Sequence, residues 1–412
     1  MSDININLAA GESKRLLTAG KYCPSDVLVT AESGGGYVPP ETTLLDPDEV
    51  YRTTRPSSWL PLPTPNDYEC FCLGHILKGL KGYFAATITY NGTCVVEYGT
   101  LSNGEFVAKE SFTPTSGTIF SKALNYSDYG DELEDGTRQY IVRIYGTDIR
   151  SIDFRKHTIS IPRVHVVDIV SGIASNFTAG DHNNKRSGLE SLRYLRFVGN
   201  GRPNLLSGKF VAGCPSLMSV SMVNEIPYNS GHWGAGDYAF FETPSLIAVS
   251  PLGFSELTTA THMFRASTLP RLRTNAKLTS FDTTFGYSRL TVFDKNTFDT
   301  TNAANMYGCF SYCSCLREVT GLNITSLTIS TNMFLQCYNL SRLVFAGETT
   351  PGGYTIDLKD TTLGHDALVE MIASLPTATK AATITITNNP GASELTADEI
   401  AVATAKNWTI TI

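Results

Sequence analysis

The sequence contains no long basic run and no long apolar run. No more than two Lys or Arg residues are adjacent, as at Lys14-Arg15, and the net charge is −7. Nucleic-acid binding needs clustered positive charge, so we expect no nucleic-acid partner. No apolar stretch reaches ~18 residues, so we expect no membrane insertion. Residues 1–10 lack the basic start and apolar core of a signal peptide, so we expect synthesis in the cytoplasm.

Motifs for catalysis and for cofactor binding are also missing. Gly-x-Gly-x-x-Gly and Walker-type loops are absent, and the seven His residues are scattered without a nucleophile or metal partner at a telling spacing. Glycoside hydrolysis needs two carboxylates ~5–10 Å apart, and nothing in the sequence selects such a pair. We therefore expect no enzymatic activity, no cofactor and no metal.

Charge is scarce, and the cysteines are odd in number. Charged residues make up 17% of the chain, below the usual ~25%, a balance that is common in β-rich extracellular and virion proteins. Hydrophobic residues, at 42%, suffice for a packed core. We expect the nine cysteines to be thiols that pack as small hydrophobes. Two of the four at 309, 313, 315 and 337 fall on repeat positions, and Cys70 and Cys72 alternate along a strand, so packing explains them better than zinc.

The first 155 residues divide into three parts. Residues 1–33 form an N-terminal β segment, and 34–56 form an extended linker that begins with a glycine-rich break. Residues 57–155 predict a β-sandwich, because strand-like runs recur at 82–90, 93–99, 106–112 and 139–145. Asn91-Gly92 indicates a hairpin between the first two runs, and Ser102-Asn103-Gly104 indicates another.

Residues 156–360 predict a solenoid. The unit is Phe-x-x-Cys/Ser/Thr followed by Leu, and its Phe residues are spaced by 30, 24, 21, 25 and 24 positions. A period of ~20–29 with Leu is the signature of leucine-rich repeats, in which stacked units share a core and each Leu precedes a short parallel strand. Runs at 149–154, 164–169 and 192–198 fit earlier, degenerate turns. The predicted ladder consists of Phe210, Cys214, Leu217, Phe240, Leu246, Phe264, Phe285, Phe310, Cys313, Leu316, Phe334, Cys337 and Leu340.

Residues 361–412 differ from the repeats and predict an α/β C-terminal cap. Helical spacing covers 364–375, a β run follows at 382–387, and the chain ends on a strand at 408–412. A second helix over 395–406 carries Thr396 as N-cap and Glu399 three residues later, which is a capping box. A solenoid needs such an atypical end to cover its last apolar face. The fold class is therefore mainly β with some α.

The Phe-x-x-Cys-x-x-Leu spacing resembles the BspA-like leucine-rich repeats of bacterial surface proteins and phages. Residues 367–376 (ALVEMIASLP) and 395–408 (LTADEIAVATAKNW) look like the closing segment of such proteins in gut Firmicutes phages and prophages. Residues 13–23 (SKRLLTAGKYC) resemble the N-terminal segment of their tail and baseplate proteins, and 55–63 (RPSSWLPLP) resembles a connecting stretch. The resemblance implies an N-terminal virion attachment segment, a β domain and a distal binding solenoid.

One insertion is the candidate binding loop. The step from Phe210 to Phe240 exceeds the repeat norm by about six residues, and insertions in solenoids lie on one face and often bind ligands. Aromatic residues are enriched in binding hot spots, and a sugar could stack on the loop's Trp; the alternative is that the Trp only pins the loop to the solenoid. An exposed loop at 181–186 and an acidic loop at 128–135, which calcium could occupy, are weaker candidates. The aromatic candidates of the insertion are Tyr228, His232, Trp233 and Tyr238.

Together these features predict a phage tail-fibre or baseplate receptor-binding protein, located in the virion tail. Its expected partners are a glycan or protein receptor on the bacterial surface and other tail proteins bound through the N-terminal segment. Because several weak sites on one particle reinforce one another, we expect a homo-oligomer, a trimer by analogy with fibres. The alternatives are a bacterial surface adhesin, which would need a secretion signal and a wall anchor, and a structural virion protein without a ligand.

Overall fold

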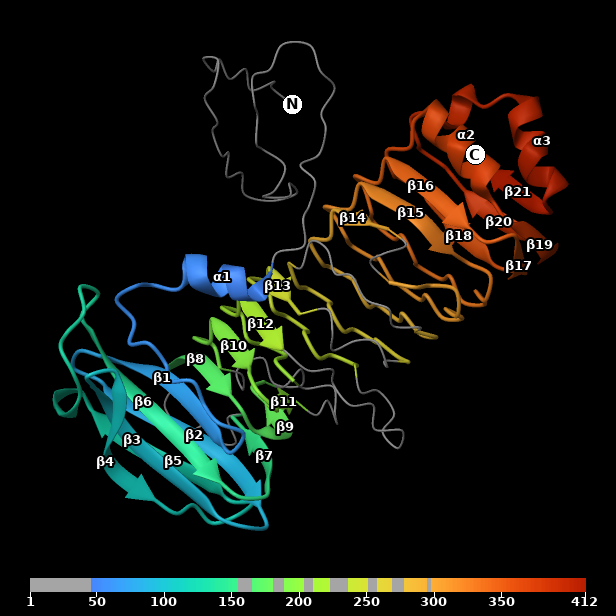
Figure 1. The fold of residues 1–412 in the computed structure, drawn as a ribbon. Coiled ribbons are helices and arrows are strands. Elements are labelled where there is room, and N and C mark those ends of the chain that lie inside the picture. The colour runs from blue at the N-terminus through green and yellow to red at the C-terminus, as the bar shows by residue number, and fades with distance from the viewer. Residues whose placement is uncertain are drawn as a thin grey trace, which may run out of the picture.

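The computed structural model describes residues 46–154, 165–180, 189–203, 210–222, 236–250, 258–268, 278–294 and 298–412. The fold is mainly β, with few helices, and includes a β-solenoid of about 8 turns. Figure 1 shows the antiparallel N-terminal sheets at one end of the molecule and two C-terminal helices at the other. The predicted attachment segment 1–33, the first part of the predicted linker (34–45) and the loop 181–186 lie outside the described residues.

The first described element is a helix, α1 (Pro47–Thr54), where we predicted an extended linker. The Asp46 side chain accepts a hydrogen bond from the backbone N–H of Asp48 at 3.0 Å, and Pro47 stands in the first turn, where its missing N–H is harmless. Asp48 and Glu49 place negative charge at the positive end of the helix dipole. The linker interpretation was therefore wrong for 47–54, because it took Asp46-Pro47 as a break when the pair is a helix start.

Two sheets with a shared core follow α1. One contains β1 (Glu69–Leu77), β3 (Cys94–Ser102), β4 (Glu105–Phe112) and β6 (Thr137–Gly146), all antiparallel. The other contains β2 (Lys81–Tyr90), β5 (Ile119–Asn125) and β7 (Ile149–Asp153). The four predicted strand runs at 82–90, 93–99, 106–112 and 139–145 coincide with β2, β3, β4 and β6. Alternating burial along β2 points Phe84, Ala86 and Ile88 into the core.

The predicted hairpin at Asn91-Gly92 is wrong, whereas the one at Asn103-Gly104 is confirmed. β2 and β3 belong to different sheets, so the chain crosses between sheets at 91–93. That corner pairs with the corner after β6: the Asn91 N–H donates to the Asp148 carbonyl at 3.1 Å. Asn103 and Gly104 have φ of 51° and 83° and join the antiparallel pair β3 and β4. The same dipeptide thus serves two geometries, and only tertiary pairing decides between them.

Both N-terminal sheets continue into the solenoid. β8 (Val166–Ser171) pairs antiparallel with β1 and parallel with β10 (Tyr194–Phe197), which is followed by β12 (Ser219–Met222) and β13 (Ala248–Val249), all parallel. In the second sheet β9 (Ala174–Thr178) and β11 (Arg202–Pro203) extend β7 in parallel. Strands therefore hydrogen-bond across the predicted domain boundary at 155/156. The runs at 149–154, 164–169 and 192–198 are parallel strands of these sheets, as predicted.

The later turns contain β14 (Val292–Phe293), β15 (Glu318–Asn323) and β16 (Arg342–Ala346), which pair in parallel. A second row of single parallel bridges joins residues 259, 280, 305 and 329 of successive turns. The prediction that a strand follows each repeat Leu is confirmed at the repeat leucines that the structure describes, because a strand begins two residues after each of them. These leucines are Leu217, Leu246, Leu290, Leu316 and Leu340. The earlier Leu192 has the same relation to β10, and the repeat Leu after Phe264 lies outside the described residues.

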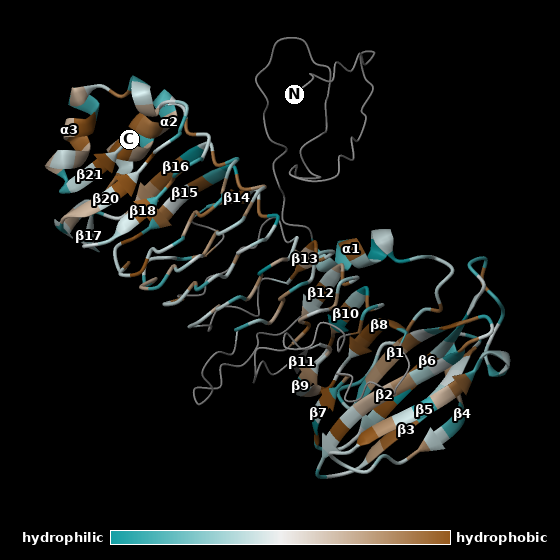
Figure 2. Ribbon diagram, turned by 180° about the vertical axis from the view of Figure 1, so that it is seen from behind, coloured by the Kyte–Doolittle hydropathy of each residue, from teal (hydrophilic) through white to brown (hydrophobic). Residues whose placement is uncertain are grey.

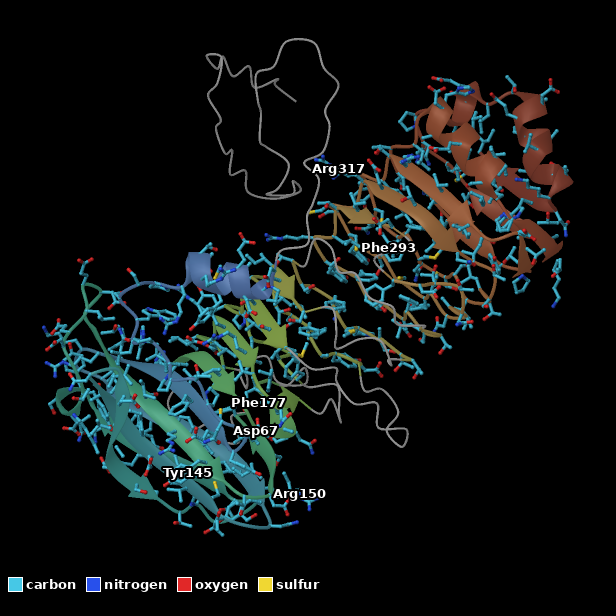
Figure 3. All side chains as sticks on the ribbon, in the orientation of Figure 1. Asp67, Tyr145, Arg150, Phe177, Phe293 and Arg317 are labelled. Atoms are coloured by element: carbon cyan, nitrogen blue, oxygen red, sulfur yellow. The ribbon has the colours of Figure 1, made fainter. Side chains whose placement is uncertain are left out.

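A ladder of phenylalanine rings runs through the solenoid core. The rings of Phe240 and Phe264 lie 5.2 Å apart and nearly parallel, and those of Phe310 and Phe334 lie 5.3 Å apart. At the N-terminal end the ladder meets Phe177, whose ring centroid is 6.2 Å from that of Phe210 (Figure 3). The same buried cluster extends from Cys70 to Trp408. The solenoid and the N-terminal sheets therefore share one continuous core.

The last 64 residues contain further parallel strands and two helices at the C-terminal end of the solenoid. β17 (Thr349–Gly352) pairs with β19 (Thr377–Lys380), and β18 (Thr355–Asp357), β20 (Ala382–Thr385) and β21 (Trp408–Thr411) form a parallel sheet. α2 (His365–Ser374) and α3 (Ala397–Ala405) lie between these strands in the chain. The capping box of Thr396 and Glu399 is formed at the start of α3. Short 3-10 turns occur at Tyr126–Asp128 and Ala392–Glu394.

Hydropathy follows the strands. Figure 2 shows hydrophobic residues concentrated on the strands of the N-terminal sheets and on the C-terminal strands and helices. None of the helices that the structure describes has the length and apolar character to span a lipid bilayer. Among the cysteines that the structure describes, seven are free and buried, as expected of thiols.

Candidate functional site

Of the four candidate residues in the predicted binding loop, only Tyr238 is among the described residues. Tyr228, His232 and Trp233 lie outside the described residues, so their role stays a prediction. The Tyr238 ring stacks on the His262 imidazole at 4.8 Å and meets the Phe241 ring edge-on at 5.6 Å. Tyr238 therefore belongs to a row of side chains that spans neighbouring turns.

The backbone of each turn explains why such rows form. In five turns the residues two before and two after the ladder Phe have positive φ. This conformation disfavours residues with a Cβ by ~1–2 kcal/mol, yet here it aims alternate N–H groups at the carbonyls of the next turn. The Tyr287 N–H donates to the Ser311 carbonyl at 2.8 Å, and the Tyr312 N–H donates to the Leu335 carbonyl at 2.7 Å. The positive-φ pairs are Tyr238 and Glu242, His262 and Ala266, Thr283 and Tyr287, Gly308 and Tyr312, and Asn332 and Gln336.

Because the turns repeat, side chains at equal positions stack into a surface row that we name the turn-face stripe. The Arg265 guanidinium lies over the Phe241 ring at 5.4 Å and over the Tyr287 ring at 5.0 Å. The Tyr287 and Tyr312 rings are parallel at 4.4 Å. Each member touches the next, so the stripe is continuous over four turns. Phe241 is buried and supports the row from beneath, whereas the other members are half-buried or exposed. The members are Tyr238, Phe241, His262, Arg265, Tyr287 and Tyr312.

Several large apolar side chains are exposed to solvent along these turns. Tyr287 is 47% exposed although it belongs to the stripe, and large apolar side chains on the next two turns are also exposed. Single exposed apolar residues are ordinary, whereas a cluster of them marks an interaction surface. The neighbours in question are Tyr307, Leu335 and Tyr338.

The buried thiols of the ladder do not provide a reactive group. Burial raises the pKa of Cys313 to about 12, so this thiol stays protonated at neutral pH. Its Sγ–H donates to the Phe285 carbonyl at 2.9 Å, and that of Cys337 donates to the Phe310 carbonyl at 3.0 Å. These contacts give the small residues of the repeat a hydrogen-bonding role in addition to the packing role that their size predicts.

The carboxylates of the acidic loop at 128–135, which was a candidate calcium site, each bind a different partner. Asp128 accepts a hydrogen bond from the Asn125 amide at 3.0 Å, Glu132 pairs with Lys78 at 3.0 Å, and Asp135 accepts one from the Thr137 hydroxyl at 2.6 Å. Across the described residues, no group of three or more His, Cys, Asp or Glu side chains is arranged to hold a metal ion.

The sequence contains a signal for the turn-face stripe, although the repeat pattern alone did not predict it. Tyr287 and Tyr312 each stand two residues after a ladder Phe, so an alignment of the repeats on Phe places them in one column. Arg265 occupies the position one residue after Phe264, and only the positive φ of its neighbours brings it over Tyr287.

Comparison with known proteins gives no relative. No family model matches the chain, and neither the curated proteins nor the solved structures contain a match.

Proposed function

We propose that this protein is a phage tail-fibre or baseplate component that attaches the virion to a bacterial surface through its solenoid. The observation that carries the proposal is the turn-face stripe. Aromatic and Arg side chains dominate binding hot spots, because they offer a large contact area at a low entropy cost. Here both kinds are joined in one continuous row that includes the half-exposed Tyr287 and continues to Tyr312.

Within this proposal the repeats are leucine-rich repeats of the BspA-like kind. The supporting features are a buried Leu two residues before each strand, the stacked Phe ladder and the small hydrogen-bond donors that follow each Phe. The two N-terminal sheets act as a β-sandwich, and residues 361–412 act as the C-terminal cap. Residues 1–33 attach the chain to other tail proteins, and three copies of the chain assemble into the fibre.

Two rival functions use the same solenoid differently. A bacterial surface adhesin would also bind through the stripe, but to another cell. A structural virion protein would leave the stripe without a ligand, and its exposed aromatic rings would then have no role. The stripe therefore favours a binding function over a structural one.

The test is binding of the fluorescently labelled full chain to a panel of Firmicutes cells. The variant Tyr287→Ser/Tyr312→Ser removes the parallel ring pair, and Trp233→Ala tests the predicted loop. Tyr68→Ser is the matched control, because Tyr68 is 62% exposed and precedes the first strand of the N-terminal sheets. We expect strain-selective binding that falls at least about tenfold in the double variant and is unchanged in the control.

Three other results would redirect the proposal. Selective binding that survives in the double variant but is lost in Trp233→Ala would move the site to the loop. Binding to non-bacterial cells alone would favour the adhesin. Absence of binding to every strain would favour the structural protein.

A further inference from the structure

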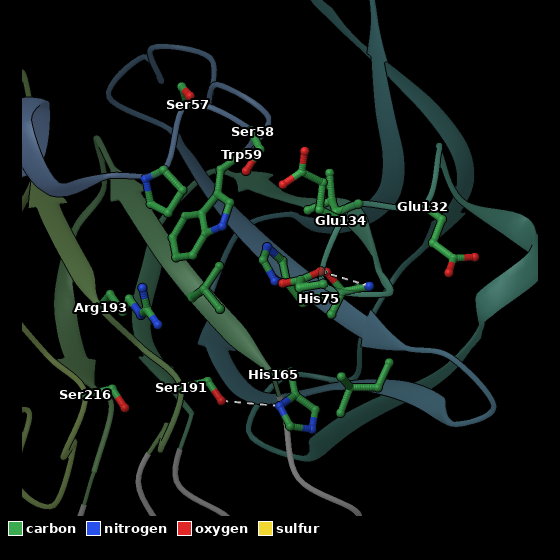
Figure 4. Close-up of a pocket in the computed structure, with 16 residues that line it drawn as sticks. Ser57, Ser58, Trp59, His75, Glu132, Glu134, His165, Ser191, Arg193 and Ser216 are labelled. Atoms are coloured by element: carbon green, nitrogen blue, oxygen red, sulfur yellow. Dashed lines mark hydrogen bonds between the residues drawn. The ribbon is translucent and has the colours of Figure 1, made fainter.

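A cleft of about 810 Å³ lies between the N-terminal sheets and the first solenoid turns (Figure 4). One wall is the segment 56–59 after α1, and another is the loop 132–137 before β6. The solenoid contributes residues 165–167 and 191–193. Its volume falls within the ~300–1,000 Å³ of small-molecule sites, and it is separate from the turn-face stripe.

His75 lines this cleft, and its Nε2 is a buried polar atom without a hydrogen-bond partner in the described part of the chain. The residue is only 9% exposed. The imidazole is held in place, because the Trp59 ring meets it edge-on at 5.1 Å and its backbone N–H donates to the His165 carbonyl at 2.9 Å. An unpaired buried polar atom is unfavourable, so a ligand hydroxyl that pairs with Nε2 gains affinity.

The rim of the cleft offers both hydrogen-bond donors and acceptors. The Arg193 guanidinium lies 5.6 Å from the centre of the Trp59 ring and makes no ion pair within the described residues. Glu134 adds an exposed carboxylate, and the hydroxyl of Ser191 lies 3.2 Å from His165 Nδ1. Glu132 and Asp135 also line the cleft, and Lys78 pairs with Glu132, so the carboxylates outnumber the guanidinium and the cleft disfavours an anionic ligand.

We propose that this cleft binds one or two residues of a neutral glycan. Sugar hydroxyls both donate and accept hydrogen bonds, as the mixed rim requires, and the apolar face of a sugar ring suits the wall formed by Trp59 and Val167. Burial keeps His75 uncharged at neutral pH, which suits a hydroxyl better than an ionised ligand group. The site does not depend on the proposed virion function.

The experiment is calorimetric titration of the full chain at pH 7 with maltose, lactose, cellobiose and N,N′-diacetylchitobiose, and with glutamine as a zwitterionic probe. The cleft variants are His75→Phe, which keeps a ring of similar shape, and Arg193→Met, which keeps the side chain's length. Arg150→Met is the matched control, because Arg150 is an exposed arginine at the start of β7 (Figure 3). Circular dichroism checks the fold of each variant.

We expect saturable binding of at least one disaccharide, weakened about tenfold or more in each cleft variant and unchanged in the control. The stripe variant Tyr287→Ser/Tyr312→Ser should bind that disaccharide normally, which separates this site from cell attachment. Absence of saturable binding by all four disaccharides overturns the proposal, and so does binding that both cleft variants retain. Saturable binding of glutamine alone would also overturn it. If His75→Phe fails to fold, the exposed Arg193→Met variant decides.

Discussion

The residue three positions after the ladder phenylalanine is a buried donor in four turns. The hydroxyls of Thr243 and Ser267 donate to the Phe carbonyl of their own turn at 2.7 and 2.8 Å. The thiols of Cys313 and Cys337 donate instead to the Phe carbonyl of the preceding turn. A small donor satisfies a buried carbonyl without overfilling the core, which explains why Ser, Thr and Cys occupy this position.

The phenylalanine ladder should carry a large part of the stability. Phe310 is fully buried, and its ring contacts those of Phe285, Phe293 and Phe334 at 5.7, 5.1 and 5.3 Å. Phe310→Ala should lower the free energy of unfolding by ~3–5 kcal/mol, because it leaves a cavity between stacked rings. Urea denaturation measures the loss. Tyr307→Ala, on the same turn but exposed, should change stability by less than ~0.5 kcal/mol, and an equal effect of both variants would contradict the ladder's role.

His75 should make the protein less stable in mild acid. Burial lowers its pKa to about 4, only partly opposed by the nearby Asp135, whereas an unfolded histidine titrates near ~6.5. As the pH falls through this window, the unfolded chain binds a proton that the folded chain rejects. The free energy of unfolding should therefore fall by about 2–3 kcal/mol between pH ~7 and ~4.5 from this group alone.

The measurement for His75 is the urea midpoint at both pH values. The variant His75→Phe lacks the titrating group but keeps all other acid-sensitive groups, so its loss of stability in acid should be smaller by the same amount. An identical pH dependence in the two proteins would show that His75 titrates normally.

At the scale of elements, α1 is fixed to the solenoid by a buried ion pair. The Arg55 guanidinium donates to Asp168 on β8 at 2.8 Å, and the Tyr51 hydroxyl donates to the same oxygen at 3.1 Å. Asp168 is fully buried, and desolvation raises its pKa although Arg55 acts to lower it. The charge of Asp168 is therefore compensated mainly by Arg55, with a smaller contribution from Arg196.

Removal of Arg55 should be strongly destabilising. Arg55→Met leaves the Asp168 carboxyl buried without its counter-ion, and we expect a loss of ~3–5 kcal/mol in the free energy of unfolding. The double variant Arg55→Met/Asp168→Leu should recover much of the loss, because it buries no charge. Urea denaturation of both variants tests the pair, and equal losses in the two would show that packing of α1, not charge, is what Arg55 provides.

The start of α3 gives a smaller, local prediction. Thr396→Ala removes the side chain that accepts from the Glu399 N–H, so we expect a loss of ~0.5–2 kcal/mol. Thr404→Ala is the control, since Thr404 bonds only to the Ile400 carbonyl within the same helix. Thermal unfolding followed by circular dichroism should show a lower midpoint for Thr396→Ala alone.

Sequence patterns predicted elements well where one local rule dominates. The Leu of each repeat predicted the start of a parallel strand, and Thr396 with Glu399 predicted the start of a helix. Sequence patterns failed where pairing with distant strands determines the structure. At Asn91-Gly92, for example, the two flanking strands belong to different sheets. The turn-face stripe was also not predicted. Tyr287 and Tyr312 adopt a positive φ, which the hydrogen bonds between turns impose and which tyrosine does not favour by itself.

At the scale of the whole molecule, the N-terminal sheets and the first turns form one hydrogen-bonded unit. β1 pairs with β6 on one side and with β8 on the other, and β7 pairs with both β2 and β9. A cut at the predicted boundary of 155/156 would expose two strand edges and would remove Asp168 from Arg55. Exposed long edges promote aggregation.

The last prediction concerns fragments. Residues 57–155 alone should be unfolded or aggregated, whereas 46–222 should be soluble, because it keeps α1, the β1–β8 pair and the parallel strands to β12. Hydrogen exchange of the full chain should protect the amides of β1 and β8 to the same extent, since they open together. A soluble, cooperatively folding 57–155 fragment would show instead that the N-terminal sheets are an independent domain, on which the solenoid only extends an edge.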